Sequence, residues 1–364
     1  MKYIFLLSKE DLKLAKEEVL SLFNIDKYKL IDNLLFLELD DIELADRSSF
    51  QRPKGNGKTD LEKMRRISKH FDRLAYTKKV YQFLFESNEK DIKNKIEEFD
   101  WQSIYKKDFA VRISGKDQFN LKEKTLASHI WNKLKNPKVN LNNPKTHIEF
   151  FMIKKKIYAA RLIKDPHHTF ESRKAHKRPE RHPTALNPKL ARAIINLAGA
   201  KKSIMDPFCG AGGILIEAGL IGLKPIGYDL YKIMVEKSEK NLKHYKIKNY
   251  KLVNQDALKI KSKYDYIITD VPYGLNSAIW KKVGKENKKI PLKQDDRKKG
   301  IKNLEGFYLE FLKNLKKIMK IKAVVIFPNY VDYKKLVKKA NLKIEKEFSQ
   351  YIHKSLTRKI LVLS

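Results

Sequence analysis

The chain has 364 residues, and 79 lysines and arginines against 43 aspartates and glutamates give it a net charge of +36. This excess predicts a polyanionic partner, most simply nucleic acid, although a solvated lysine-rich surface is the alternative. Cys209 is the single cysteine, which excludes a disulfide framework and a cysteine zinc site and favours an intracellular, cytoplasmic protein. No apolar run reaches the length of about 18 residues that a membrane span needs, so we expect no membrane partner.

The amino-terminal residues predict a small α/β region. Residues 2–7 alternate as a strand, and Ser8 is placed to cap a helix with an apolar stripe from Leu12 to Phe23. A loop containing glycines and lysines follows over residues 47–60. The other expected elements are a strand over 30–39, a helix over 61–76, a strand over 80–85 and a helix over 92–99.

A second α/β region has expected strands over 109–113, 146–153 and 156–163 and a helix over 121–134. The last two strands form a hairpin around Lys154-Lys155-Lys156. With the stretch Phe109-Ala110-Val111-Arg112-Ile113-Ser114-Gly115-Lys116, this order resembles a THUMP domain, an RNA-binding module of tRNA-modifying enzymes. The resemblance extends over residues 50–163 and implies that residues 1–163 form a ferredoxin-like plus THUMP RNA-binding domain.

Residues 164–188 form a basic linker, because four prolines prevent a long helix there. The linker also holds histidines, but without cysteines or a helical histidine spacing we expect no metal site. Basic side chains of the THUMP-like region and the linker are candidate RNA phosphate contacts, with ordinary surface charge as the alternative for each. They are Arg112, Lys116, Lys154, Lys155, Arg173, Lys177, Arg178 and Arg181.

The stretch from Ser203 to Gly213 predicts a strand, a glycine-rich turn and a helix. Its glycines leave the backbone bare, so a ligand can approach the N–H groups at the start of the helix. Three later strand ends also carry an acid, at Asp229, Asp256 and Asp270. Asp229 follows the turn at the spacing at which an acid accepts hydrogen bonds from ribose hydroxyls. We therefore expect four strand ends to converge on one crevice.

Two motifs in this half resemble those of S-adenosylmethionine-dependent methyltransferases. Asp206-Pro207-Phe208-Cys209-Gly210-Ala211-Gly212 is similar to their first motif, and Asp270-Val271-Pro272-Tyr273 is similar to the motif of those that methylate exocyclic amines, with Val271 where proline is usual. The resemblance implies a Rossmann-like class I domain over residues 189–364 with a mostly parallel seven-stranded sheet. It also implies S-adenosylmethionine as cofactor, bound by Asp206, Phe208, Cys209, Gly210, Gly212, Gly213, Asp229, Leu230, Asp256 and Ala257.

The second motif predicts the catalytic residues Asp270, Val271, Pro272 and Tyr273. The exocyclic amine of a base is a poor nucleophile, and hydrogen bonds to the Asp270 carboxylate and the Val271 carbonyl stabilise the charge that builds on it. Asp270 is also placed to take the released proton, and Tyr273 offers a face for the extruded base. Cys209 lies in the cofactor turn, so we expect no covalent role for it.

Residues 275–303 are strongly basic and predict either a mobile lid over RNA or a solvated insertion. The remaining expected elements are helices over 304–319 and 330–340 and strands over 323–327, 342–348 and 356–363.

Taken together, residues 50–364 resemble the archaeal tRNA guanine-10 N2-methyltransferases. The resemblance implies tRNA as partner and N2-methylation once or twice; we favour a monomer. Two alternatives stay open: a guanine-N2 methyltransferase for another tRNA or rRNA position, and an RNA-binding protein with a silent catalytic domain, which only Val271 favours.

Overall fold

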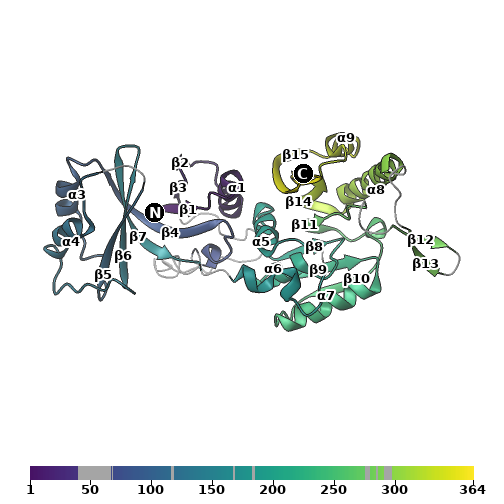
Figure 1. The fold of residues 1–364 in the computed structure, drawn as a ribbon, viewed down its shortest axis with the longest axis horizontal. Helices are drawn as coiled ribbons and strands as arrows, with labels where there is room; N and C mark the ends of the chain where they lie inside the picture. The colour runs from purple at the N-terminus through teal and green to yellow at the C-terminus, as the bar shows by residue number, and fades with distance from the viewer. Residues whose placement is uncertain are drawn as a thin grey trace, which may run out of the picture. The chain divides into compact units, whose positions relative to one another are not determined.

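The computed structural model describes residues 1–39, 67, 69–115, 119–166, 169–182, 185–274, 279–283, 286–290 and 297–364, with the backbone alone for 279–283, 286–290 and 297–299. The chain divides into two compact units (Figure 1). The first contains residues 1–16 and 23–167, and the second contains residues 17–22 and 168–364. The division after residue 167 falls inside the stretch that the prolines predict as a linker.

The first unit is built on one seven-stranded sheet with the order β2-β3-β1-β4-β7-β6-β5. The long strand β4 pairs with β1 on one side and with β7 on the other, so the amino-terminal region and the THUMP-like region share a continuous sheet. The strands are β1 (Lys2–Leu7), β2 (Lys29–Ile31), β3 (Leu34–Glu38), β4 (Thr77–Ser87), β5 (Phe109–Gly115), β6 (Thr146–Ile153) and β7 (Lys156–Lys164).

Three details of this unit differ from the sequence prediction. Asp11, and not Ser8, caps the first helix, because its Oδ1 accepts a hydrogen bond from the Leu14 N–H at 2.9 Å. The single strand expected over 30–39 is a hairpin, β2 and β3, and Asp32 takes the left-handed conformation in its turn, with φ of +50°. Of the helix expected over 61–76, residues 61–66 and 68 lie outside the described residues, and the described helical residues end at Phe71, where a turn follows. The predicted helices α1 (Leu12–Phe23), α3 (Ile92–Glu98) and α4 (Glu123–Trp131) are present, and α3 and α4 bury Ile96 and Ile130 in one apolar cluster.

The second unit contains a seven-stranded sheet with the order β10-β9-β8-β11-β14-β16-β15. Only β16 runs against the others, so the mostly parallel sheet of the predicted methyltransferase domain is confirmed. The strands are β8 (Ser203–Asp206), β9 (Lys224–Asp229), β10 (Lys251–Asn254), β11 (Tyr264–Asp270), β14 (Met319–Pro328), β15 (Ile344–His353) and β16 (Leu356–Leu363). The strand order reverses between β8 and β11, which is where a sheet of this kind opens a crevice at its carboxyl edge.

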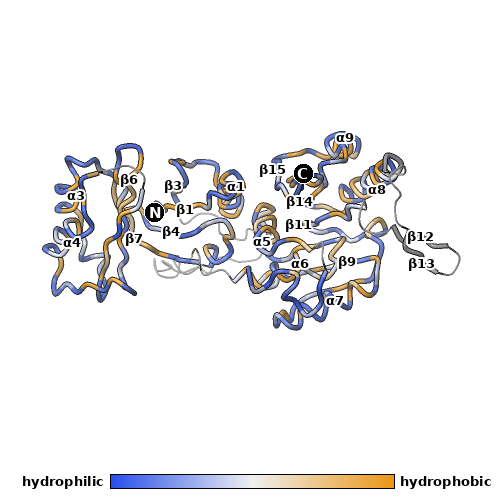
Figure 2. The backbone as a smooth tube through the Cα atoms, viewed as in Figure 1, coloured by the Kyte–Doolittle hydropathy of each residue, from blue (hydrophilic) through white to orange (hydrophobic). Residues whose placement is uncertain are grey.

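Helices cover both faces of this sheet (Figure 1). They are α5 (Pro188–Leu197), α6 (Gly213–Leu220), α7 (Lys232–His244), α8 (Arg297–Ile318) and α9 (Tyr333–Lys339). Figure 2 shows α6 as largely hydrophobic and α7 as largely hydrophilic, because α6 is enclosed while α7 buries only Ser238, Asn241 and Leu242. Phe311 and Leu315 of α8 pack on Ile267 and Val325 in the core beneath the carboxyl edge. None of the described helices is long and apolar enough to cross a membrane.

The basic segment after the second motif contains two paired antiparallel strands, β12 (Ile279–Val283) and β13 (Glu286–Ile290). Helix α8 begins at Arg297, seven residues before the predicted start. The remainder of the segment expected to form a lid or insertion lies outside the described residues.

Candidate active site

The turn after β8 depends on glycine. Gly210 and Gly212 have φ angles of +52° and +82°, in the left-handed region that side chains disfavour. A Cβ on Gly212 would lie 2.5 Å from Ser238 Oγ. The Gly212 N–H donates to the carbonyl of Cys209 at 2.8 Å, which closes the turn. Bare backbone therefore leads into the amino terminus of α6, and a ligand with polar groups fits such a cradle.

Asp206 lies beneath this turn and is 2% exposed. Its Oδ1 accepts hydrogen bonds from the Phe208 N–H at 3.0 Å and from Thr269 Oγ1 at 2.7 Å. Burial raises the pKa of Asp206 to about 7, against the lowering effect of these two donors. The carboxyl group thus connects the glycine turn to β11 through these two hydrogen bonds.

Asp229 ends the neighbouring strand β9. Its Oδ2 accepts from the Gly210 N–H and its Oδ1 from the Tyr231 N–H, both at 2.9 Å. Burial raises the pKa of Asp229, and the two backbone donors oppose this rise. Each carboxylate oxygen keeps a second lone pair, which is what two ribose hydroxyls require. The next side chain, Leu230, is 58% exposed and offers an apolar surface beside the carboxylate.

The third strand end is joined to the second by Asn254, whose amide donates to the carbonyls of Asp229 and Leu230 at 3.0 and 2.9 Å. Asp256 then caps a short 3₁₀ turn, η3 (Ala257–Lys259), by accepting from the Leu258 N–H at 2.9 Å. Ala257 is buried. The acids of the first three strand ends therefore share one hydrogen-bonded edge, as the sequence predicts.

Phe208 and Cys209 complete the first motif. The Phe208 ring packs on Phe307 and Phe311 of α8, with centroids 5.8 and 4.9 Å apart. Cys209 is 5% exposed, and burial raises the pKa of its thiol well above the ordinary value. A thiol held in its protonated form is a poor nucleophile.

The second motif follows β11, directly beside β8. The Tyr273 hydroxyl donates to Asp270 Oδ1 at 2.5 Å. Burial raises the pKa of Asp270 to about 6, while Arg358 and the Tyr273 hydroxyl lower it. Since its side chain is 16% exposed, the carboxylate remains accessible at the carboxyl edge. The site thus shifts the pKa of this carboxyl group from its ordinary value toward neutral pH.

Val271, the departure from the family motif, is 2% exposed. Its N–H donates to the Ile326 carbonyl of β14 at 3.3 Å, a bond that proline cannot make. The motif is further held by tyrosine hydroxyls. Tyr308 donates to the Pro272 carbonyl at 2.7 Å, and Tyr330 donates to the Tyr273 carbonyl.

The sequence prediction missed Arg358, which is 9% exposed on β16. Its Nε donates to the Tyr273 hydroxyl at 3.0 Å, and its Nη2 lies 3.7 Å from Asp270 Oδ2. Arg358 follows Asp270 by 88 positions in the chain, and only the strand order brings the two together. No local pattern in the sequence marks Arg358 as buried, so sequence reasoning had no signal for it.

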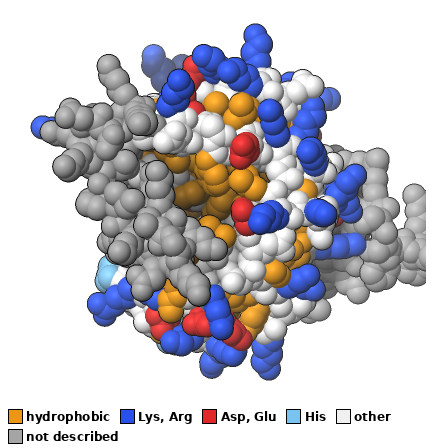
Figure 3. Space-filling model, turned by 90° about the vertical axis from the view of Figure 1, so that its right-hand side faces the viewer, with side chains coloured by type: hydrophobic (Ala, Val, Ile, Leu, Met, Phe, Trp, Pro, Cys, Tyr) orange, Lys and Arg blue, Asp and Glu red, His pale blue; other side chains and the backbone are white. Residues whose placement is uncertain are grey.

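One face of the molecule has a hollow with apolar walls and acidic side chains beside it (Figure 3). Lysines and arginines cover much of the surface around it. The positive charge of these side chains attracts a polyanion, while the apolar walls suit a base or another flat ring.

The candidate RNA contacts of the first unit differ in their surroundings. Lys154 and Lys155 are exposed and form the turn between β6 and β7, with φ angles of +54° and +59°. Arg112 is half-buried; its Nη2 donates to the Leu141 carbonyl at 2.7 Å, and its Nη1 lies 3.6 Å from Glu123. Lys116 lies outside the described residues.

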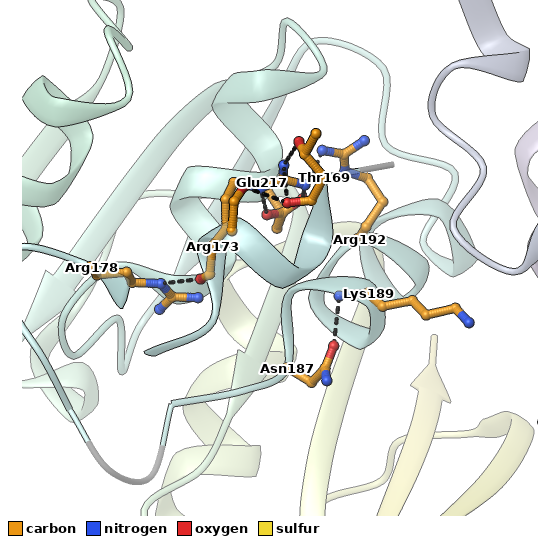
Figure 4. A network of polar contacts seen from close by, with 8 residues as sticks. Thr169, Arg173, Arg178, Asn187, Lys189, Arg192 and Glu217 are labelled. Atoms are coloured by element: carbon orange, nitrogen blue, oxygen red, sulfur yellow. Dashed lines mark hydrogen bonds and ion pairs between the residues drawn. The ribbon is translucent and has the colours of Figure 1, made fainter. Parts of the chain in front are cut away.

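The candidate contacts of the linker divide into two exposed and two buried side chains. Lys177 and Arg181 are exposed. Arg173 is 7% exposed and donates through Nε to Glu217 at 2.7 Å, while Arg178 is 3% exposed and donates through Nε to the Arg173 carbonyl at 2.8 Å (Figure 4). Burial of both guanidinium groups does not fit a direct phosphate contact.

The buried pair belongs to a network that fixes the linker on the catalytic unit. Glu217 of α6 is 0% exposed and receives both Arg173 and Arg192 of α5, each at 2.7 Å. Arg173 also donates to Thr169 Oγ1 at 2.6 Å. The linker therefore packs against the helix that starts at the glycine turn. Within the described ranges no group of three or more metal-ligating side chains is present.

Two family models match the chain. Residues 86–159 match the THUMP domain, and residues 175–285 match the RMKL-like methyltransferase domain. The solved structure of TrmN from Thermus thermophilus is 14% identical and covers 100% of this chain and 99% of its own, with a TM-score of 0.47, which is too low to support an argument. The first match confirms the expected RNA-binding module, and the second confirms a methyltransferase that uses S-adenosylmethionine.

Among curated proteins, a tRNA (guanine(10)-N2)-dimethyltransferase of Methanothermobacter thermautotrophicus is 33% identical over 80% of this chain and 83% of its own length. The enzyme of the same name from Pyrococcus abyssi is 31% identical over 75% of this chain and 79% of its own. A tRNA (guanine(6)-N2)-methyltransferase of Archaeoglobus fulgidus is 29% identical but covers only 38% and 42%. With its THUMP and methyltransferase domains, the chain belongs to the family of archaeal tRNA (guanine(10)-N2)-dimethyltransferases.

Proposed function

We propose that the chain methylates the exocyclic N2 of guanosine 10 in tRNA and produces N2-methylguanosine and then N2,N2-dimethylguanosine. Two features of the second unit support this reaction. A glycine cradle with Asp229 ends β8 and β9, and an accessible carboxylate ends β11, the strand beside β8. The nucleotide position comes from the names of the relatives. The observation that most supports methyl transfer is that β8 and β11, whose carboxyl ends hold the two motifs, are neighbours in the sheet.

The donor side consists of the first three strand ends. S-adenosylmethionine, when bound, supplies a methyl group on a sulfonium, which is a strong electrophile. We propose that Gly210, Gly212 and Gly213 admit its methionine part, and that Asp229 accepts from its ribose hydroxyls with Leu230 packed beside them. Asp256 and Ala257 are proposed to hold the adenine end, and Phe208 and Cys209 to line the turn. Asp206 acts indirectly, because its carboxyl group fixes the turn from below.

The acceptor side is the second motif. Asp270, when ionised, accepts a hydrogen bond from the guanine amine, and this localises charge on the nitrogen as it reacts. Its pKa near 6 lets it hold the released proton transiently and lose it again at neutral pH. The Val271 carbonyl is proposed to accept the second hydrogen bond, while Pro272 and Tyr273 bound the space for the base.

The first unit and the linker are proposed to bind the tRNA backbone. Lys154, Lys155, Lys177 and Arg181 are exposed and cationic, as a phosphate contact requires. Arg112 and Lys116 remain candidates, while Arg173 and Arg178 hold the linker instead. One chain carries both an RNA-binding and a catalytic part, so we propose that it acts as a monomer.

The test is methylation of unmodified tRNA transcripts, with nucleoside analysis and mapping of the product. We expect N2-methylated guanosine at position 10 and no product from a transcript with adenosine there, whereas a transcript changed at position 6 remains a substrate. Asp270→Asn is expected to bind the cofactor in calorimetry and to lose at least about 100-fold in rate. Product at another guanosine would overturn the assigned nucleotide. Wild-type protein that binds RNA but no cofactor would overturn the enzymatic function.

A further inference from the structure

Arg358 of the last strand contacts both polar side chains of the acceptor motif. Its guanidinium is nearly buried, lies 3.0 Å from the Tyr273 hydroxyl through Nε, and lies 3.7 Å from Asp270 Oδ2 through Nη2. We infer that Arg358 is a positioning residue for methyl transfer, which holds the Asp270 carboxylate in place and in its ionised form and fixes the Tyr273 ring. The inference rests on the proposed role of Asp270.

The sheet register explains why this position reaches the site. Arg358 pairs with Pro328 on β14, and Asp270 pairs with Ile326 of the same strand. The arginine therefore lies two strands away and slightly beyond the carboxyl edge, and its long side chain extends back across β14. The antiparallel strand β16 is thus a third contributor to the active site, after the strands that carry the two motifs.

The three side chains form a closed set of contacts. Tyr273 donates to one carboxylate oxygen of Asp270, and Arg358 pairs with the other while donating to the tyrosine oxygen. A guanidinium presents several donors in a fixed fork, so one side chain serves both partners. Lysine has the same charge, but its ammonium is a compact point charge without the planar fork, so it does not hold the two partners in the same geometry.

The charge of Arg358 also has an identifiable effect. The other titratable groups near Asp270 are Tyr273 on its own segment, Asp206 at the end of β8 and Tyr308 of α8. None of these is a cation, so Arg358 is the one cation that the described residues place against this carboxylate. Without it, burial would favour the protonated form of Asp270, which cannot accept a hydrogen bond from the amine in the same way.

The test compares Arg358→Gln and Arg358→Lys with wild type in methylation of the tRNA that the wild type accepts, from pH 5 to pH 9. We expect Arg358→Gln to lower kcat on the order of 10-fold to 100-fold at pH 7 and to move the acidic limb of kcat upward by about one pH unit, so that the defect shrinks at pH 9. Arg358→Lys should move the limb less, because it retains the charge, but it should still lower kcat. Cofactor affinity and KM for tRNA should stay within about twofold.

Lys359→Gln is the matched control, because it removes one positive charge from the next residue of β16, whose Nζ donates instead to Ser349 at 2.9 Å. It should leave the pH profile unchanged. A pH-independent loss in Arg358→Gln, or an equal loss of cofactor affinity, would overturn the inference in favour of a structural role. If Arg358→Gln does not fold, the test rests on Arg358→Lys. A kcat and a pH profile equal to those of wild type in that variant would overturn the inference. A wild-type product at another nucleotide would refute the assigned substrate and leave this test intact.

Discussion

Replacement of Asp206 by asparagine should remove a loss of stability that the wild-type protein undergoes as pH rises toward neutral. The buried carboxyl has a pKa of about 7 in the folded protein against an ordinary value of 3.8. The folded state therefore binds this proton more tightly than the unfolded chain, so the stability contribution is full below pH 3.8 and is lost as pH rises toward 7. At 1.36 kcal/mol per pKa unit the whole loss is about 4 kcal/mol, of which about 3 kcal/mol falls above pH 5.

Asparagine removes this pH-dependent loss and keeps Oδ1, the oxygen that accepts from Phe208 and Thr269. The new amide N–H₂ has a cost of its own, but that cost does not vary with pH. We therefore expect the free energy of unfolding of Asp206→Asn, relative to wild type, to rise by about 3 kcal/mol between pH 5 and pH 8.

The assay is urea unfolding at the two pH values, followed by hydrogen exchange of peptides from β8 and β11. Tryptophan fluorescence is less suitable, because Trp101 and Trp131 lie in the first unit and the third tryptophan, Trp280, lies on β12, outside the seven-stranded sheet. Asp265→Asn on the same strand β11 is the matched control, since Asp265 is 48% exposed and lies 3.7 Å from Lys320 in a surface ion pair. If the free energies of unfolding of wild type and Asp206→Asn change equally between pH 5 and pH 8, then ionisation of the buried Asp206 does not lower the stability of the protein.

Three further predictions concern the cofactor cradle, the linker and the RNA surface. Asp229→Asn should weaken cofactor binding in calorimetry by at least about 10-fold, because one oxygen that accepts a backbone N–H becomes a donor; unchanged affinity would count against the proposed ribose contact. Glu217→Ala leaves two buried guanidinium groups unpaired and should cost about 3–5 kcal/mol in thermal or urea unfolding, whereas a surface role predicts almost no change. The double substitution Lys154→Glu, Lys155→Glu should raise KM for tRNA, leave kcat unchanged and flatten the salt dependence of binding; an unaltered salt slope would exclude this turn from the interface.

The sequence predicts the second unit well because its chemistry sits at strand ends. A strand followed by glycines or by an acid is a local pattern, and parallel strands bring their carboxyl ends to one edge whatever lies between them. Asp206, Asp229 and Asp270 could therefore be grouped without knowledge of the register. Arg358 could not, because nothing in Thr357-Arg358-Lys359 distinguishes the buried cation from the half-buried lysine beside it until β16 is placed beside β14.

In the linker, the basic composition predicted phosphate contacts for two arginines that the structure buries. Arg173 and Arg178 stand in a run of basic residues, and a cationic run beside an RNA-binding module suggests phosphate contacts. The structure shows that Glu217, on a helix that the sequence predicts as wholly apolar apart from this residue, receives Arg173 and also Arg192. An acid isolated in an apolar helix requires a buried cation, so Glu217 was the signal that the linker packs on α6.

Val271 can be reconciled with the acceptor motif once the contacts around the motif are considered. A proline at this position would restrict the backbone by its own ring. Here the same segment is restrained from outside: the Val271 N–H bonds to β14, Tyr308 holds the Pro272 carbonyl, and Tyr330 holds the Tyr273 carbonyl. The side chains are restrained in the same manner by Arg358. Because four separate contacts fix the geometry, the absence of one proline leaves the Asp270 carboxylate in place. Val271 is therefore no longer evidence for a silent catalytic domain.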